Sequence, residues 1–117
     1  MNISVVVLTK NEEKKIEQAI RSAQFANEIL LIDDYSTDKT LEIVKRYKVK
    51  FVQRRLNNNF SQQRNFALKQ AKGDWIFFLD ADEEITPELK EEIKTVVSIN
   101  NKFCAFYIKR RDIFWGR

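Results

Sequence analysis

The feature that most constrains the fold is an alternation along the chain between short apolar runs and segments with apolar residues at helical spacing. Residues 3–8 form a run of mostly β-branched and apolar residues, which is typical of a strand buried on both faces of a sheet. Ile16, Ala19, Ile20 and Ala23 then fall on one face of a helix. The same two patterns recur, with strands expected at residues 28–32, 49–53, 75–79 and 103–109, and with helices between the strands. This order predicts an α/β fold with a mostly parallel sheet flanked by helices.

Local signals also predict helix ends. Ser36 or Thr37 could cap the second helix, since a hydroxyl can accept a free backbone N–H there. Asn59 and Gln62 have the spacing of a capping box at the start of the third helix. Gly73 follows that helix, in the place where a glycine often ends one.

Length and composition exclude several classes of protein. The 117 residues suit one domain, so residues 1–117 are expected to form a single unit. The chain has one cysteine, Cys104, and no histidine, which excludes an intrachain disulfide, Cys-based metal sites and His-ligated zinc.

The sequence also bears on location and partners. Without a basic N-terminal region or a long apolar run, we expect a cytoplasmic location. The net charge of +4 comes from lysines and arginines spread along the chain, which argues against a nucleic-acid surface. Phe114 and Trp115 follow the basic residues 109–111, so they could contact the inner membrane face peripherally. The alternative, which we favour, is that they belong to a core whose other residues lie beyond Arg117.

Polar residues follow each of the first four predicted strands directly. The segments are Thr9–Glu12, Asp33–Ser36, Gln53–Arg55 and Asp80–Glu83. The carboxyl ends of parallel strands meet at one edge of a sheet, where ligands bind in open α/β folds. Helices begin at the same edge, and their free N–H groups favour an anion. We therefore expect these segments to share one ligand.

Asp80 and Asp82 are the strongest candidates for a metal site. Two residues apart on an extended segment, their side chains point the same way, and two close carboxylates repel each other unless a cation intervenes. Oxygen ligands of this kind suit Mg²⁺ or Mn²⁺ together with substrate phosphates. The alternative is that the acids complement the dipole of the following helix, which we favour for Glu83 and Glu84.

Three further polar residues have two interpretations each. One of Asp33 and Asp34 could hold a turn, while the other could bind a ligand amide or a ribose hydroxyl. Arg64 could be a solvated helical arginine or a ligand contact.

These segments, in this order, resemble family 2 glycosyltransferases with the GT-A fold. The matching stretches are VVLTKNEE at residues 6–13, LIDDYSTDKT at 31–40, QRNFA at 63–67 running into AKGDW at 71–75, and LDADE at 79–83. Arg111, Phe114, Gly116 and Arg117 resemble a later motif of the lipopolysaccharide-core glucosyltransferase subgroup. The resemblance implies a Rossmann-like, nucleotide-binding N-terminal half of such an enzyme.

The resemblance also implies roles for the site residues. Nucleotide contacts would come from Thr9, Glu12, Asp33, Asp34, Arg64 and Asp80. Asp82, with Asp80 beside it, would bind the divalent metal on the diphosphate. Tyr35 stands where the family usually has glycine. The donor would be a nucleotide-diphospho-sugar, with UDP expected, and the acceptor an envelope glycan or a lipid-linked sugar.

The chemistry explains why such a site needs acids. The departing diphosphate must be neutralised, which a metal ion can do as a Lewis acid. An inverting transfer also needs a carboxylate to take the acceptor's proton. In the family this base lies in the acceptor-binding half, which we expect beyond Arg117, so a donor-binding module without transferase activity is an alternative.

Two alternatives come from other classes. Residues 29–34 are similar to the acidic first strand of a bacterial receiver domain, and Asp80 could then be the phosphoacceptor. That interpretation leaves the strand at residues 3–8 unexplained. In a phosphatase, Asp80 would be the nucleophile and Asp82 the acid, but such a pair usually follows the first strand.

Overall fold

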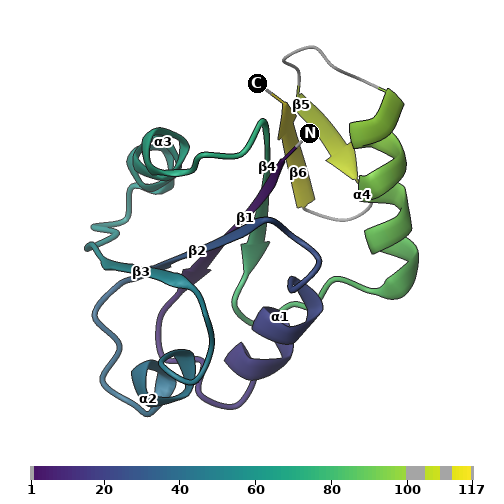
Figure 1. The fold of residues 1–117 in the computed structure, drawn as a ribbon. Coiled ribbons are helices and arrows are strands. Elements are labelled where there is room, and N and C mark those ends of the chain that lie inside the picture. Colours follow the sequence, from purple (N-terminus) through teal and green to yellow (C-terminus); the bar gives the residue numbers. More distant parts are fainter. Residues whose placement is uncertain (1, 100–104, 109–111, 117) are drawn as a thin grey trace.

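The chain forms one mixed sheet with helices packed on both faces (Figure 1). The structure is a computed structural model that describes residues 2–99, 105–108 and 112–116. In chain order, its elements are β1 (Ile3–Thr9), α1 (Ile16–Ser22), β2 (Glu28–Asp33), α2 (Thr40–Val44), β3 (Lys50–Gln53), α3 (Phe60–Gln70), β4 (Trp75–Asp80), α4 (Pro87–Ile99), β5 (Ala105–Ile108) and β6 (Asp112–Gly116). The predicted alternation of strands and helices is confirmed as far as α4.

The sheet has the strand order β3-β2-β1-β4-β6-β5. β1 pairs in parallel with β2 and β4, and β2 pairs in parallel with β3. β6 is antiparallel to both β4 and β5. The predicted mostly parallel sheet is therefore confirmed, and the strand predicted at residues 103–109 is present as β5, at the edge of the sheet. Residues 103, 104 and 109 of that predicted strand lie outside the described residues.

Two hydrophobic clusters hold the helices to the sheet, because successive residues of a strand face opposite sides. Val5, Val7 and Phe77 face the side covered by α1, α2 and α4. Val6 and Ile76 face the side covered by α3. The central strands are thus buried on both faces, as their apolar sequence predicts. Burial of each such side chain stabilises the fold by about 1.5–3 kcal/mol.

The prediction for Gly73 is wrong. α3 ends at Ala71 in an extended conformation, and no glycine in the described residues has a positive φ. Gly73 instead lies against Ser4 of β1, where a Cβ would come within 2.5 Å of Ser4 Oγ and 2.7 Å of Ser4 N. Close packing between two backbones, rather than a left-handed turn, therefore requires the glycine.

The capping predictions have mixed outcomes. α2 begins only at Thr40, and Asp38, not Ser36 or Thr37, accepts a hydrogen bond from the Thr40 N–H at 2.9 Å. Asn59 does cap α3, with its side chain accepting from the Gln62 N–H at 3.0 Å. The Asn59 N–H itself donates to the Leu56 carbonyl, so only half of the predicted capping box is present.

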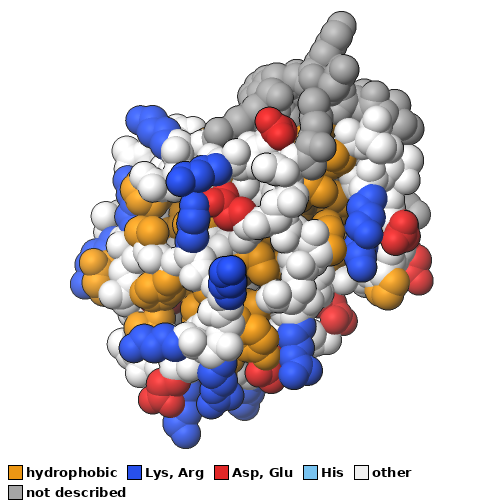
Figure 2. All heavy atoms as spheres, viewed as in Figure 1, with side chains coloured by type: hydrophobic (Ala, Val, Ile, Leu, Met, Phe, Trp, Pro, Cys, Tyr) orange, Lys and Arg blue, Asp and Glu red, His pale blue; other side chains and the backbone are white. Residues whose placement is uncertain are grey.

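The surface carries charges of both signs. Figure 2 shows lysine and arginine side chains spread over one face, with hydrophobic and acidic side chains between them. None of the helices in the described part of the chain is both long and apolar enough to cross a membrane.

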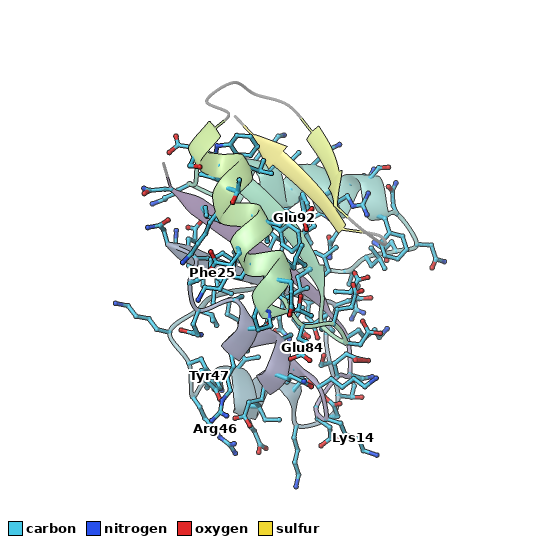
Figure 3. All side chains as sticks on the ribbon, turned by 90° about the vertical axis from the view of Figure 1, so that its right-hand side faces the viewer. Lys14, Phe25, Arg46, Tyr47, Glu84 and Glu92 are labelled. Carbon is cyan, nitrogen blue, oxygen red and sulfur yellow. The ribbon has the colours of Figure 1, made fainter. Side chains whose placement is uncertain are left out.

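α4 completes the layer of helices beside α1. Phe25, just after α1, lies beside α4 (Figure 3), where its ring centroid is 5.8 Å from Lys90 Nζ. Pro87 is the first residue of α4, and Thr86 Oγ1 accepts a hydrogen bond from the Leu89 N–H at 3.1 Å. The loop that leads from β4 into α4 is therefore held at the end where α4 begins.

Candidate functional site

Backbone hydrogen bonds bring the carboxyl ends of β1, β2 and β4 together. The Asp34 N–H donates to the Thr9 carbonyl at 2.9 Å, and the Ala81 N–H donates to the Leu8 carbonyl at 3.2 Å. In the sheet register, Thr9 lies opposite Asp33 and Leu8 lies opposite Asp80. The segments that the sequence predicts at one edge of the sheet are therefore neighbours.

A cavity of about 170 Å³ opens at this edge. It is lined by Leu8, Thr9, Lys10, Ile32, Asp34, Leu56, Phe60, Gln63 and Asp80. Thr9 is only 6% exposed, and its Oγ1 has no hydrogen-bond partner among the described residues. A buried hydroxyl without a partner costs about 1–3 kcal/mol. Because side chains alternate along β1, this hydroxyl lies on the face of Val5 and Val7, and Leu8 lies on the other face with Val6.

The two neighbouring aspartates differ in what they contact. Asp33 is fully buried, and its carboxylate accepts from the Ser36 N–H at 2.8 Å and from Ser36 Oγ at 2.5 Å. Asp34 lines the cavity, and its Oδ2 lies 3.7 Å from Lys10 Nζ. Asp33 thus shapes the turn after β2, while Asp34 lines the cavity, and the predicted contact of Asp33 with a nucleotide remains a prediction.

The loops after β1 and β2 are joined through Asn11. Its Oδ1 accepts from the Thr37 N–H at 2.7 Å and the Asp38 N–H at 3.3 Å, and its own N–H donates to Ser36 Oγ at 2.8 Å. Sequence reasoning missed this role. The usable signal was an asparagine in a loop, because asparagine tolerates the left-handed conformation that Asn11 adopts with φ 51°.

Tyr35 adopts the left-handed conformation usually left to glycine, with φ 50°. Its ring is 42% exposed, and the Arg55 guanidinium carbon lies 4.4 Å from the ring centroid. The contact links the loop after β2 to the loop after β3. The turn expected of a glycine is therefore present with a tyrosine in it.

Glu12 contributes to the site through its backbone. The Glu12 N–H donates to Thr40 Oγ1 at 3.0 Å, and its carbonyl accepts from the Ile16 N–H at 2.8 Å at the start of α1. Its side chain is not among those that line the cavity. The structure thus gives Glu12 a part in holding the loop, and its predicted contact with a nucleotide remains a prediction.

Arg64 lies on α3, next to the strand that carries the acids. Its guanidinium carbon is 5.9 Å from the ring centroid of Phe78, two residues before Asp80 on β4. The side chain is exposed, so its charge can reach a ligand at this edge. This position supports the predicted contact without testing it.

Three carboxylates gather after β4. Oxygens of Asp80, Asp82 and Glu83 all lie within 4.8 Å of one another, with both aspartates exposed and Glu83 half-buried. The Glu83 N–H donates to the Asp80 carbonyl at 2.9 Å, so a tight turn brings the three together. Such a set of hard oxygen donors fits Mg²⁺ or Mn²⁺. From the sequence, Glu83 is expected only to complement the dipole of the following helix, so its place in this cluster was missed.

The family model for glycosyl transferase family 2 matches residues 4–115. The chain belongs to this family. The match covers all four segments at the edge of the sheet, and it removes the ground for the receiver-domain and phosphatase interpretations.

Relatives and solved structures agree with the family. A glycosyltransferase of Rickettsia bellii is 38% identical over 110 residues, which cover 92% of this chain and 37% of that protein. The structure of TarS from S. aureus in complex with UDP is 34% identical, with a TM-score of 0.70, and the match covers 84% of this chain and 32% of that one. The chain thus spans well under half the length of these relatives.

A more distant structure has the same fold. The mannosyltransferase PcManGT from Pyrobaculum calidifontis, in complex with GDP-Man and Mn²⁺, has a TM-score of 0.78 at 18% identity. The match covers 99% of this chain and 44% of that one. The chain therefore has the GT-A fold that its sequence predicts.

Proposed function

We propose that residues 1–117 are the donor-binding domain of a glycosyltransferase that uses a nucleotide-diphospho-sugar, with UDP as the nucleotide. The observation that carries this proposal is the position of Asp80. It lines the cavity beside Thr9 and Asp34, and it also belongs to the carboxylate cluster with Asp82 and Glu83. A ligand with a nucleoside at one end and a diphosphate at the other fits this arrangement.

Each part of the site has a distinct task in this proposal. Asp34 binds the base and ribose in the cavity, and Asp33 keeps the turn that presents Asp34. Arg64 adds positive charge near the base or the diphosphate. Asp80 and Asp82 hold a divalent metal, which neutralises the leaving diphosphate as a Lewis acid.

The donor proposal draws on relatives as well as on geometry. TarS, at 34% identity, was solved with UDP, and PcManGT, which shares the fold, was solved with GDP-Man and Mn²⁺. The cluster of oxygen donors in this chain suits Mg²⁺ and Mn²⁺ alike.

The acceptor side belongs to the proposal as well. We propose an envelope glycan or a lipid-linked sugar as acceptor, and a base in the acceptor-binding half of the family rather than among residues 1–117. Arg111 and Arg117 of the lipopolysaccharide-core motif lie outside the described residues, so that subgroup remains a prediction. The cytoplasmic location and the contact with a membrane surface remain predictions too.

Donor binding without transfer is a second candidate for this chain. The observation in its favour is that the chain spans 37% of its Rickettsia bellii relative. Transfer or slow hydrolysis of UDP-sugar by the 117-residue chain would exclude it, and UDP binding without either reaction would support it.

Asp82→Asn tests the metal site. Removing one charged ligand should weaken Mn²⁺-dependent binding of UDP at least about tenfold, measured by calorimetry with and without the metal. Glu84→Gln is the matched control, because Glu84 is an exposed acid next to the cluster but outside it. An Asp82→Asn variant that binds UDP and Mn²⁺ like the parent would show that the site is assigned wrongly.

A further inference from the structure

The cavity at the edge of the sheet has two chemically different sides. Its polar side is formed by Thr9, Asp34 and Asp80. Its apolar side is formed by Leu8, Ile32, Leu56 and Phe60. A nucleobase needs both, because its rim makes hydrogen bonds while its flat faces make apolar contacts.

Phe60 is the aromatic side chain at this cavity. It is 57% exposed, more than Tyr35 at 42% or Phe51 at 39%, neither of which lines the cavity. A single exposed phenylalanine needs no explanation by itself. Here, however, the ring borders the same space as Asp34 and Asp80, so a ligand bound to these carboxylates lies within reach of the ring.

The loop before Phe60, which is the first residue of α3, is held in place before any ligand arrives. Asn57 and Asn58 both adopt the left-handed conformation, with φ 50° and 56°, and Asn59 caps α3 directly before Phe60.

The first turn of α3 is also anchored to β3. The buried Gln63 accepts from Arg54 Nη1 at 2.6 Å and donates to the Arg54 carbonyl at 2.8 Å. Because the backbone around Phe60 is fixed at both ends, its ring needs little ordering to receive a flat ligand.

We propose that Phe60 is the stacking wall for the base of the donor nucleotide. This inference rests on the proposed function, and it adds a positioning residue for the base to those that the family resemblance assigns. Hydrogen bonds to Asp34 would select the base, while Phe60 would supply affinity that depends on a flat ring. Aromatic contacts of this kind change affinity by about tenfold or more per base.

A cycle of two ligands and two proteins tests the proposal. Affinities for UDP and for dihydro-UDP, in which the uracil ring is saturated and no longer flat, are measured by calorimetry with Mn²⁺ for the parent and for Phe60→Ala. The parent should prefer UDP about tenfold. Phe60→Ala should lose this preference, because the aromatic ring that stacks on a planar base is gone. Phe60→Tyr should restore it.

Phe51→Ala is the control, since Phe51 is an exposed aromatic residue on β3 that does not line the cavity. It should keep the preference, and thermal unfolding without ligand should show that Phe60→Ala is as stable as the parent. An equal preference for UDP in Phe60→Ala and the parent, or no preference in the parent, would overturn the proposal. A parent chain that binds no UDP at all would instead overturn the function proposed above, and this inference with it.

Discussion

Thr9 and Asp33 lie opposite each other in neighbouring strands, yet only one of the two side chains has its hydrogen bonds satisfied. The Asp33 carboxylate is fully buried and is hydrogen-bonded within its own turn. The Thr9 hydroxyl is almost as buried but has no partner among the described residues. At the scale of single residues, this difference separates a group that stabilises the turn after β2 from a group that costs the fold stability.

Thr9→Val tests this distinction. The change keeps the shape of the side chain and removes a hydroxyl that costs stability while it is unpartnered. The free energy of unfolding without ligand should therefore stay the same or rise by up to about 1 kcal/mol. UDP affinity should change by less than about twofold, because the hydroxyl lies on the face of the sheet opposite the cavity.

Thr95→Val, on the exposed face of α4, serves as the control and should leave UDP affinity unchanged. Chemical denaturation and calorimetry measure the two quantities. A Thr9→Val variant that is clearly less stable, or that binds UDP at least about tenfold more weakly than the parent, would contradict the assignment.

At the scale of elements, most of what the sequence predicts is local, and most of what it misses is not. Apolar periodicity predicts β1 to β4 and α1 to α4 because each pattern is complete within its own segment. Ser36 does not cap α2, since its hydroxyl contacts Asp33 and the distant Asn11 instead. Gly73 must be a glycine because Ser4, which is far away in the chain, leaves no space for a Cβ. β6 was not predicted, because its place between β4 and β5 depends on tertiary pairing.

The amino-terminal end of the sheet has its own polar connection at Glu28. Its carboxylate accepts from Ser4 Oγ at 2.6 Å, from the Lys72 N–H at 2.9 Å and from Lys50 Nζ at 2.5 Å. Burial acts to raise the pKa of Glu28, but the hydrogen bonds from Lys50, Ser4 and Lys72 outweigh it and hold the pKa below its ordinary value of 4.5. The three bonds tie β2 to β1, to β3 and to the segment before β4.

Glu28→Gln should therefore change how stability depends on pH. Because the folded-state pKa is lowered, Glu28 stabilises the fold above its unfolded pKa, and this contribution is lost as the pH falls through 4.5 and below. The variant should unfold more easily near neutral pH, by about 1 kcal/mol. Its stability should also fall less steeply in acid.

Urea denaturation across a pH series measures both effects of this change. Glu88→Gln, an exposed acid at the start of α4, provides the comparison and should keep the acid slope of the parent. An unchanged acid slope in Glu28→Gln would show that Glu28 is not the titrating group.

At the scale of the whole molecule, the site exists because the strand order places β1 in the middle of the sheet. β1 has β2 on one side and β4 on the other, so Thr9 can lie between the acids that follow both neighbours. The sequence predicts this meeting of strand ends, because parallel strands must share an edge. It could not predict that Asp34 rather than Asp33 lines the cavity, or that Glu83 joins the cluster, because both depend on how the turns fold.

A crystal structure of the chain grown with UDP and Mn²⁺ tests the central claim most directly. We predict a metal ion between the carboxylates of Asp80 and Asp82 and the diphosphate, with the base in the cavity beside Thr9. A nucleotide bound elsewhere, for example at the amino-terminal ends of the strands, or a metal ion away from Asp82, would contradict this account.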